Sequence, residues 1–270
     1  MSLYTIFGGS GFIGSEFIKH LSSTDNSIYI PKKNDLNIYK KPLGTVIYCA
    51  GYGDCKSDPF NVIDANTFLV KEILQRASFD RFVYISSTRV YMNQDISSED
   101  SNLTVSYDDN RKLFNLSKLI TEELCLNSKK NCLVIRPSNI YGLALNSKLF
   151  LPSIIRNAIN NNMIDMYVDK NYSKDYLSVH NLIDATLRLL SVKNLPSIVN
   201  IASGKNTTAE ELAFVLEEET SCKVNWHQPQ STCENFPITD ISLINKLINF
   251  QPNMVLDDMR EMIASYKNII

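Results

Sequence analysis

The sequence predicts an α/β fold in which a doubly wound parallel sheet carries a smaller, interleaved α+β lobe towards the C-terminus. Short β-branched and aromatic segments alternate with longer segments of helical periodicity, which is typical of β-α-β units. The strand segments are mostly apolar on both faces, as they are when helices cover both sides of a parallel sheet. With 270 residues the chain buries roughly three quarters of its unfolded surface, so it needs no disulfide or metal ion to form a core.

Six strands are predicted in the larger part of the chain, with helical segments between them. The strands are expected at Leu3–Phe7, Ser27–Ile30, Thr45–Ala50, Phe82–Ser86, Cys132–Arg136 and Ile198–Ile201. The helices are expected near residues 12–22, 60–77, 110–127 and 179–191. From about residue 143 the pattern changes to a helix around 151–161, a polar stretch near 163–175, and helices near 208–219 and 256–268. No linker rich in proline, glycine or serine separates the two parts, so the lobe is expected to interleave with the sheet.

Composition and charge exclude several classes of protein. The chain has 27 Lys and Arg against 29 Asp and Glu, a formal net charge of −2, which argues against a nucleic-acid partner. No apolar run reaches the roughly 18 residues of a membrane span, and Met1–Phe7 lacks the basic start of a signal peptide. The six cysteines are scattered, without a CxxC pair or a metal-ligand spacing. These features predict a cytoplasmic protein with no membrane partner and no metal site.

A glycine-rich segment follows the first strand directly and leads into a helix. Glycine is required where the turn is tight, where backbone NH groups approach a pyrophosphate, and where the helix packs closely on the strand. The helix N-terminus then offers NH groups and the positive end of its dipole to the phosphates. In this strand–turn–helix context the motif predicts a Rossmann-type dinucleotide site. Its predicted contacts are Gly8, Ser10, Gly11, Phe12, Ile13 and Gly14.

The end of the second strand bears on the choice between NADP(H) and NAD(H). An NAD site places an acidic residue there to hold the ribose 2′-hydroxyl, whereas a cationic side chain accommodates a 2′-phosphate. Lys32 and Lys33 follow this strand, and the first carboxylate comes only at Asp35. The pattern favours NADP(H), with NAD(H) as the alternative, and it assigns Lys32, Lys33, Asp35 and Leu36 to the cofactor site. The competing interpretation is that both lysines are solvated loop charges.

Three further segments follow predicted strands or lie on a predicted helix. Tyr84–Tyr91 has the sequence YISSTRVY, Phe114–Leu119 has FNLSKL, and Arg136–Gly142 has RPSNIYG. Together with the glycine-rich segment they resemble the extended short-chain dehydrogenase/reductase family, the NAD-dependent epimerases and dehydratases that modify nucleotide sugars. The resemblance covers nearly the whole chain, and the motifs occur in the family's order. It implies a dinucleotide-binding domain formed by 1–142 with 177–203, and a substrate-binding lobe formed by 143–176 with 204–270.

The resemblance also implies roles for single residues. It makes Ser87 the hydroxyl that hydrogen-bonds the sugar, and Lys118 the residue that holds the nicotinamide ribose and lowers the pKa of a tyrosine one helical turn earlier. That tyrosine is the family's general acid/base, and Phe114 stands in its place. The further cofactor contacts that it implies are Ala50, Gly51, Lys118 and Pro137. The substrate contacts that it implies are Ser87, Thr88, Arg89, Asn139 and Lys174.

Phe114 has three interpretations, because it keeps the aromatic ring and lacks the phenol that would protonate the alkoxide. The chain is a deliberately disabled variant that binds without turnover, or an enzyme in which Thr88, Tyr91, Tyr107 or water donates the proton. The third interpretation is a binding or regulatory protein that has lost catalysis. The sequence does not choose among the three.

The residues that follow Ser87 narrow the class of reaction. Dehydratases of this family have an Asp-Glu pair there, where this chain has Thr88 and Arg89. The 3,5-epimerase/reductases have a cysteine at the position of Arg89 and a histidine at that of Leu149. A reductase or a 4-epimerase remains. Arg89 itself either reaches an anionic group of the ligand or forms a structural ion pair.

The two lysines and the short chain favour an NADPH-dependent reductase over a 4-epimerase. Its expected substrate is a nucleoside-diphosphate sugar with a keto or aldehydo group, used in the synthesis of surface-polysaccharide sugars. The alternatives are an NAD-dependent nucleotide-sugar 4-epimerase and a catalytically dead NADP-binding regulatory protein. Members of the family are commonly homodimers through central helices, so a homodimer through the stretches 60–77 and 110–127 is also expected.

Overall fold

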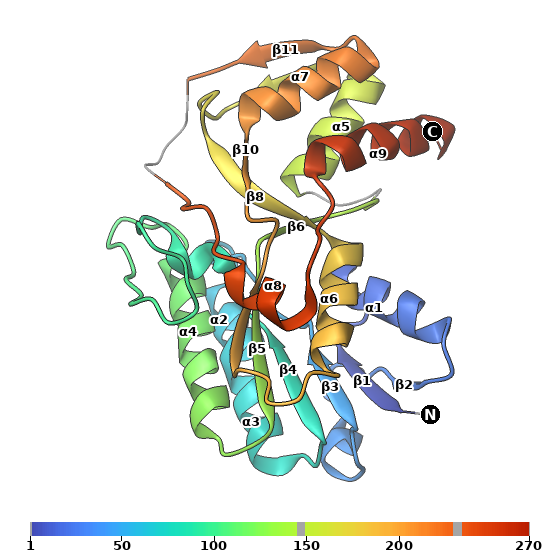
Figure 1. Cartoon of the computed structure of the whole chain (residues 1–270), viewed down its shortest axis with the longest axis vertical. Helices are drawn as coiled ribbons and strands as arrows, with labels where there is room; N and C mark the ends of the chain where they lie inside the picture. The colour runs from blue at the N-terminus through green and yellow to red at the C-terminus, as the bar shows by residue number, and fades with distance from the viewer. Residues whose placement is uncertain (1, 145–148, 229–233, 270) are drawn as a thin grey trace.

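A six-stranded, fully parallel sheet with the order β2-β1-β3-β4-β5-β9 lies at the centre of the computed structural model, which describes residues 2–144, 149–228 and 234–269 (Figure 1). The strands are β1 (Leu3–Phe7), β2 (Ser27–Tyr29), β3 (Thr45–Tyr48), β4 (Arg81–Ile85), β5 (Cys132–Pro137) and β9 (Ile198–Ile201). From β1 the chain continues to β2 on one side of β1 and then to β3 on the other side of β1. This reversal of strand order between β1 and β3 is the switch point of a doubly wound sheet. The predicted fold class is confirmed.

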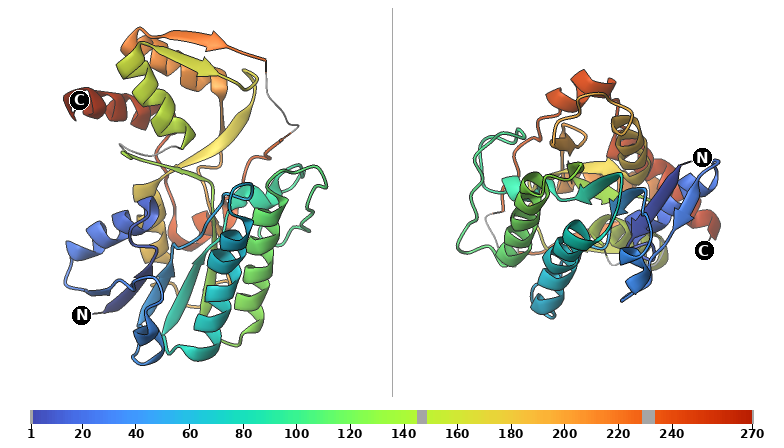
Figure 2. Two further views of the ribbon diagram at one scale, coloured as in Figure 1. Left: turned by 180° about the vertical axis from the view of Figure 1, so that it is seen from behind. Right: turned by 90° about the horizontal axis from the view of Figure 1, so that it is seen from below.

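Helices cover both faces of this sheet. The helices of one face are α1 (Phe12–Ser22) and α6 (Val179–Leu189), and those of the other face are α3 (Leu69–Arg76) and α4 (Lys112–Asn127). Figure 2 shows these layers from behind and from below. Along β3, Ile47 packs in the core shared with α1 and α6, whereas Val46 and Tyr48 pack against α3 and α4. Because successive side chains of a strand point to opposite faces, both faces must be apolar, as the sequence pattern indicated.

The predicted helix at 60–77 is interrupted in the structure. It consists of α2 (Pro59–Ile63), a π-helical turn (Asp64–Phe68) and α3. The turn places Asn66 fully inside the protein, where its side-chain amide donates to the carbonyl oxygen of Tyr52 and accepts from the amide NH of Tyr52, both at 2.9 Å. The extra residue of the π turn therefore anchors the loop that follows β3.

The smaller lobe lies above the carboxyl ends of the sheet strands (Figure 1). Its strands are β6 (Asn139–Tyr141), β7 (Met163–Met166), β8 (Ser173–Ser178), β10 (Asn206–Thr208) and β11 (Lys223–Trp226), and its helices are α5 (Phe150–Asn161), α7 (Ala209–Thr220) and α9 (Val255–Ile269). The strands form a three-stranded sheet, β10-β8-β6, and the pair β11-β7. Ile155, Met166, Leu216 and Met259 form part of a separate apolar core there. The three lobe helices agree with prediction, whereas the five strands were not predicted.

The chain passes between the two parts more than once. After β8 it returns to the large sheet through α6 and β9, and after β11 it returns again through α8 (Ser242–Ile248). Ile244 and Phe250 pack in the core formed by the sheet, α1 and α6, although the sequence assigned this stretch to the lobe. No helix in the described part of the chain is both long and apolar enough to cross a bilayer.

Candidate active site

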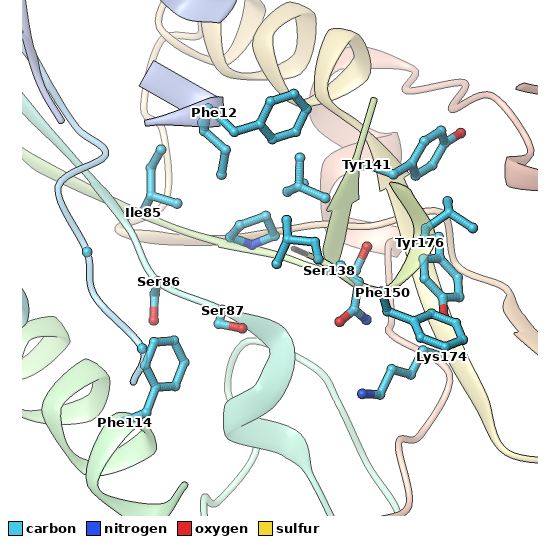
Figure 3. Close-up of a pocket in the computed structure, with 18 of the residues that line it drawn as sticks. Phe12, Ile85, Ser86, Ser87, Phe114, Ser138, Tyr141, Phe150, Lys174 and Tyr176 are labelled. Carbon is cyan, nitrogen blue, oxygen red and sulfur yellow. The ribbon is translucent and has the colours of Figure 1, made fainter. Parts of the chain in front are cut away.

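A cavity of about 650 Å³ opens between the carboxyl ends of the sheet strands and the smaller lobe (Figure 3). This is the edge at which ligands bind in doubly wound sheets. The predicted site residues that line the cavity are Gly11, Phe12, Ile13, Gly51, Ser87, Phe114, Lys118, Pro137, Asn139 and Lys174. The predicted site residues outside its lining are Gly8, Ser10, Gly14, Lys32, Lys33, Asp35, Leu36, Ala50, Thr88 and Arg89.

The glycines of the first loop serve two different purposes. A Cβ on Gly8, which has φ +76°, would lie 2.6 Å from the backbone carbon of Cys49, and a Cβ on Gly14 would lie 2.3 Å from the carbonyl oxygen of Gly8. These two glycines allow close packing of the loop, β3 and α1. A Cβ on Gly11 would meet only the Gly8 oxygen, at 3.3 Å, and would otherwise extend into open space.

Gly11 also stands at the N-cap of α1, and no side chain caps the helix there. The helix has no acidic residue in its first turn, and Phe12 and Ile13 line the cavity. Unpaired backbone NH groups at a helix N-terminus bind phosphate through both hydrogen bonds and the helix dipole. The loop therefore has the open backbone that a dinucleotide pyrophosphate requires.

The carboxylate of Asp35 is engaged within the protein. It accepts hydrogen bonds from the hydroxyl of Tyr29 at 2.5 Å and from the amide of Asn37 at 3.0 Å, and these bonds lower its pKa. Lys32 and Lys33 are exposed at the same strand end. The free charged side chains beside β2 are therefore cationic, which fits a phosphate better than a ribose hydroxyl.

The structure distinguishes Ser87 from its neighbour Ser86. The hydroxyl of Ser86 donates to the buried carboxylate of Glu122, whose Oε1 accepts from Arg136 Nε at 3.1 Å. The hydroxyl oxygen of Ser87 accepts from the amide of Arg89 at 3.1 Å, which leaves its hydrogen available on the cavity side. Figure 3 shows both hydroxyls at the end of β4. Ser87 is thus the serine that can donate to a ligand, while Ser86 belongs to a buried polar network.

Lys118 is buried in the wall of the cavity. Its Nζ donates to the carbonyl oxygen of Ile85 at 2.8 Å. Desolvation lowers the pKa of Lys118 to about 8, and the charges of Glu122 and Cys49 partly oppose this shift. A Cβ on Gly51 would lie 3.0 Å from Nζ, so a larger residue after β3 would press on the ammonium group.

Phe114 lies in the cavity wall one helical turn before Lys118, as predicted. The centroid of its ring is 5.4 Å from Lys118 Nζ. Of the other suggested proton donors, Tyr107 is 91% exposed, and Tyr91 is buried and donates its hydroxyl hydrogen to Asn200 Oδ1 at 2.9 Å. Thr88 is also buried outside the lining. None of these three side chains faces the cavity, so water is the remaining suggested donor.

Arg89 forms the ion pair that was one of its two interpretations. Its Nη2 lies 2.7 Å from Asp109 Oδ1 and 2.8 Å from Glu234 Oε1, and the side chain is only 7% exposed. This network joins the segment after β4 to the segment that follows β11. The side chain of Arg89 is therefore part of an ion-pair network behind the cavity wall, and it does not line the cavity.

The lobe supplies the other side of the cavity. Asn139 is fixed by a hydrogen bond of 2.8 Å from its side-chain amide to the carbonyl oxygen of Asp175. Lys174 lies 3.8 Å from Glu234 Oε2 and beside the rings of Tyr172 and Phe236. Burial lowers its pKa to about 8. In Figure 3, Lys174 lies on the opposite side of Ser87 from Phe114. Lys118 lies on the Phe114 side of the cavity, so each side has a lysine.

The cavity also includes residues to which the sequence analysis assigned no role. These are, among others, Cys49, Tyr52, Arg111, Ser138, Tyr172 and Tyr176. Two signals could have found some of them. Cys49 is one of the last two residues of the predicted strand Thr45–Ala50, Tyr52 follows that strand, and Arg111 precedes Phe114 by one helical turn. Among the described residues, no group of three or more His, Cys, Asp or Glu is arranged to hold a metal ion.

The chain is similar to nucleotide-sugar enzymes over most of its length. A model described as the NAD dependent epimerase/dehydratase family matches residues 4–202. GDP-L-fucose synthase of Sinorhizobium fredii is 21% identical over 243 residues, which cover 78% of this chain and 77% of that protein. GDP-6-deoxy-D-mannose reductase of Pseudomonas aeruginosa is 25% identical over 243 residues, which cover 79% of this chain and 78% of the relative.

Solved structures share the fold over nearly the whole chain. MoeE5, solved in complex with UDP-glucose and NAD, superposes with a TM-score of 0.84 at 18% identity and covers 99% of this chain and 100% of its own. RMD from Pseudomonas aeruginosa, complexed with NADPH, has a TM-score of 0.80 at 20% identity, with 100% of both chains covered. The epimerase Mth375 from Methanothermobacter thermautotrophicus has a TM-score of 0.82 at 16% identity, with 99% and 94% covered.

Proposed function

This chain belongs to the NAD-dependent epimerase/dehydratase family, and from that premise we propose that it is an NADPH-dependent reductase of a keto or aldehydo group in a nucleoside-diphosphate sugar. Its homologues include nucleotide-sugar reductases, and its structural neighbours bind NAD or NADPH. The proposal rests on one observation: the N-terminus of α1 lines the same cavity as Ser87, Lys118 and Lys174. The proposed context is the synthesis of surface-polysaccharide sugars.

Different residues of the cavity would bind the cofactor, bind the substrate and polarise the carbonyl group of the sugar. The backbone NH groups of Phe12 and Ile13 in the first turn of α1 would bind the pyrophosphate, and Lys118 would hold the nicotinamide ribose. When bound, NADPH supplies the hydride. Ser87 would donate a hydrogen bond to the carbonyl oxygen of the sugar, and Lys174 would attract the diphosphate of the substrate. With Phe114 in the wall, the proton for the reduced oxygen comes from water, so turnover is slow.

The first test is the identity of the small molecules that the protein carries. Mass spectrometry of nucleotides and sugars that co-purify with the protein should detect NADP(H) together with a nucleoside-diphosphate sugar. The matching keto or aldehydo sugar nucleotide should then stimulate oxidation of NADPH. A protein that carries NAD and interconverts two sugars without net oxidation of cofactor would instead be a 4-epimerase.

A second candidate function is binding of NADP and a nucleotide sugar without turnover, as in a regulatory protein. The absence of a phenol at Phe114 favours it, because binding groups are present while the usual proton donor is missing. Tight binding of both ligands, with no oxidation of NADPH over hours, would support this second function over the first.

Replacing both Lys32 and Lys33 with Ala is expected to weaken NADPH about 10- to 100-fold, because a charge-assisted hydrogen bond to the 2′-phosphate is lost. NADH, which has no such phosphate, should bind as before. Fluorescence titration of both cofactors measures the difference. The double variant Lys129→Ala and Lys130→Ala removes the same charge from an exposed pair beyond α4, and it should leave both affinities unchanged. An equal loss for NADPH and NADH would contradict the preference for NADP(H).

We also propose that two copies associate through the face formed by α2, the π turn and α4. Large apolar side chains are exposed there: Phe60, Phe68, Leu116 and Ile120 are 83%, 54%, 43% and 50% exposed. Leu116 and Ile120 are four residues apart and therefore share one side of α4. A homodimer would remove this apolar surface from water.

The double variant Leu116→Glu and Ile120→Glu is expected to shift the protein from dimer to monomer, because four carboxylates would meet across the two-fold axis. Size-exclusion chromatography with light scattering gives the mass directly. Phe214→Glu, at a more exposed site on α7, is the control and should remain dimeric. A monomeric wild-type protein would rule out this interface.

A further inference from the structure

Arg111 places a guanidinium group in the cavity wall beside Phe114. Its Cζ lies 4.8 Å from the centroid of the Phe114 ring, and a Cβ on Gly53 would lie 3.1 Å from its Nη2. The side chain therefore lies between the start of α4 and the loop after β3, on the side of the cavity that holds Phe114 and Lys118. None of the roles proposed above uses this cation.

The two carboxylates whose charges act on Arg111 are engaged by other groups. Asp109 accepts from Arg89 Nη2 at 2.7 Å, from Asn115 Nδ2 at 3.0 Å and from the backbone amide of Arg111 at 2.8 Å. Glu234 accepts from Arg89 Nη2 at 2.8 Å. The ion pairs found within residues 2–144, 149–228 and 234–269 do not include the guanidinium of Arg111.

This part of the wall consequently has an excess of positive charge. The positive charge of Arg89 acts on both Arg111 and Lys174, and that of Arg111 acts on Lys174, against the carboxylates of Asp109 and Glu234. Desolvation lowers the pKa of Arg111, and the positive charge of Arg89 lowers it further. By contrast, the carboxylate of Glu122 raises the pKa of the buried Arg136 against the effect of burial. Within the described residues, the exposed Arg111 thus lacks the close carboxylate that the buried Arg89 and Arg136 have.

We infer that Arg111 binds a carboxylate on the hexose of the substrate, so that the preferred substrate is a nucleoside-diphosphate ketohexuronic acid, whose reduction gives the hexuronic acid. The inference rests on the proposed function, which places the sugar beside Ser87 and Phe114. The planar guanidinium forms two parallel hydrogen bonds with a carboxylate, which an ammonium group does not. Lys174, which lies on the other side of Ser87 from Phe114 (Figure 3) and within reach of the charge of Arg111, is left for the diphosphate.

Isothermal titration of the NADPH-loaded protein tests the inference with ligands that differ only at one substituent. UDP-glucuronic acid is compared with UDP-glucose, and GDP-mannuronic acid with GDP-mannose, so that two bases are covered. The wild-type protein should bind the acid of at least one pair about 10- to 100-fold more tightly than its neutral partner. Arg111→Met should abolish this preference and leave the affinity for the neutral sugar within about twofold, while Arg111→Lys should retain part of the preference.

The control variant is Arg76→Met, which removes an arginine that pairs with Glu72 on the surface of α3 and should change no affinity. An equal loss of acid and neutral sugar in Arg111→Met would show that Arg111 holds the diphosphate, and would overturn the inference while the proposed function stands. A wild-type protein without preference for the acid would also overturn it. If NADPH binds and no nucleotide sugar does, the proposed function itself is wrong, and the assignment to Arg111 is wrong with it.

Discussion

Phe114→Tyr is expected to raise NADPH oxidation by about 10²- to 10⁴-fold in the presence of the matching keto or aldehydo sugar nucleotide, which is the typical effect of a positioned general acid. The substitution adds a proton donor to a ring that already lines the cavity. Lys118 Nζ lies 5.4 Å from the ring centroid, and its pKa is lowered to about 8. The ammonium form predominates below about pH 8 and favours the phenolate, so the gain should decline as the pH rises above that value.

Two further variants separate a gain in chemistry from a change in packing. Phe114→Leu keeps an apolar side chain without a donor and should show no gain. Phe114→Tyr combined with Lys118→Met should lose the gain, because the cation beside the phenol is removed. Binding of NADPH and of the sugar nucleotide is measured for each variant, since the Phe114 form is expected to bind with little turnover.

The opposite outcome is also informative. If the Phe114→Tyr protein is no faster and unfolds at a lower temperature, the added hydroxyl lacks a hydrogen-bond partner, at a cost of about 1–3 kcal/mol. The site would then be one that accommodates phenylalanine at position 114 and has no hydrogen-bond partner for a tyrosine hydroxyl. The protein would be an enzyme that uses water as its proton donor, or a binding protein without turnover.

Gly11→Val is expected to weaken NADPH by about 10²- to 10⁴-fold while the apo protein keeps its melting temperature. The branched side chain would occupy the open space in front of the α1 N-terminus, where a Cβ meets only the Gly8 oxygen, at 3.3 Å. It would keep the pyrophosphate from the backbone NH groups, and two charge-assisted hydrogen bonds contribute about 1.5–3 kcal/mol each. Cofactor titration and thermal unfolding measure the two effects separately.

Gly14→Val is the matched comparison within the same loop. A Cβ there would lie 2.3 Å from the Gly8 oxygen, inside the packing between the loop and α1. This variant should therefore lose thermal stability whether or not cofactor is present. If Gly11→Val also unfolds early, or if it binds NADPH normally, the loop does not bind the pyrophosphate as proposed.

The strands of the large sheet were predictable because their pattern is local. β1 and β9 begin and end at the predicted residues, and the boundaries of the other four differ by no more than two residues. Apart from the partly buried edge strand β2, each is a short, mostly apolar segment buried on both faces, which little else in a globular protein resembles. The strands of the lobe lack this signal. β7 alternates exposed and buried residues over only four positions, and it pairs with β11 about sixty residues later, Met163 with Lys223.

The candidate site was predictable where backbone conformation or helical spacing determines the geometry. The open position at Gly11 and the juxtaposition of Phe114 with Lys118 follow from a strand–turn–helix motif and from residues four apart on one helix. A side chain that bonds to a distant residue was not predictable in this way. Ser86 and Ser87 are adjacent in sequence, and only the buried Glu122 on α4 decides which hydroxyl stays available.

The sequence by itself determined the doubly wound sheet, the glycine-rich loop and the replacement of the usual tyrosine by Phe114, because each of these depends on neighbouring residues alone. Only the tertiary structure decided which arginine of the site is paired with carboxylates and which is not. Arg89 is neutralised by Asp109 and by Glu234, a residue 145 positions away, while Arg111 is left with its guanidinium facing the cavity. Pairing between buried charges depends on distances of a few ångströms across the folded chain, and no local pattern of the sequence encodes them.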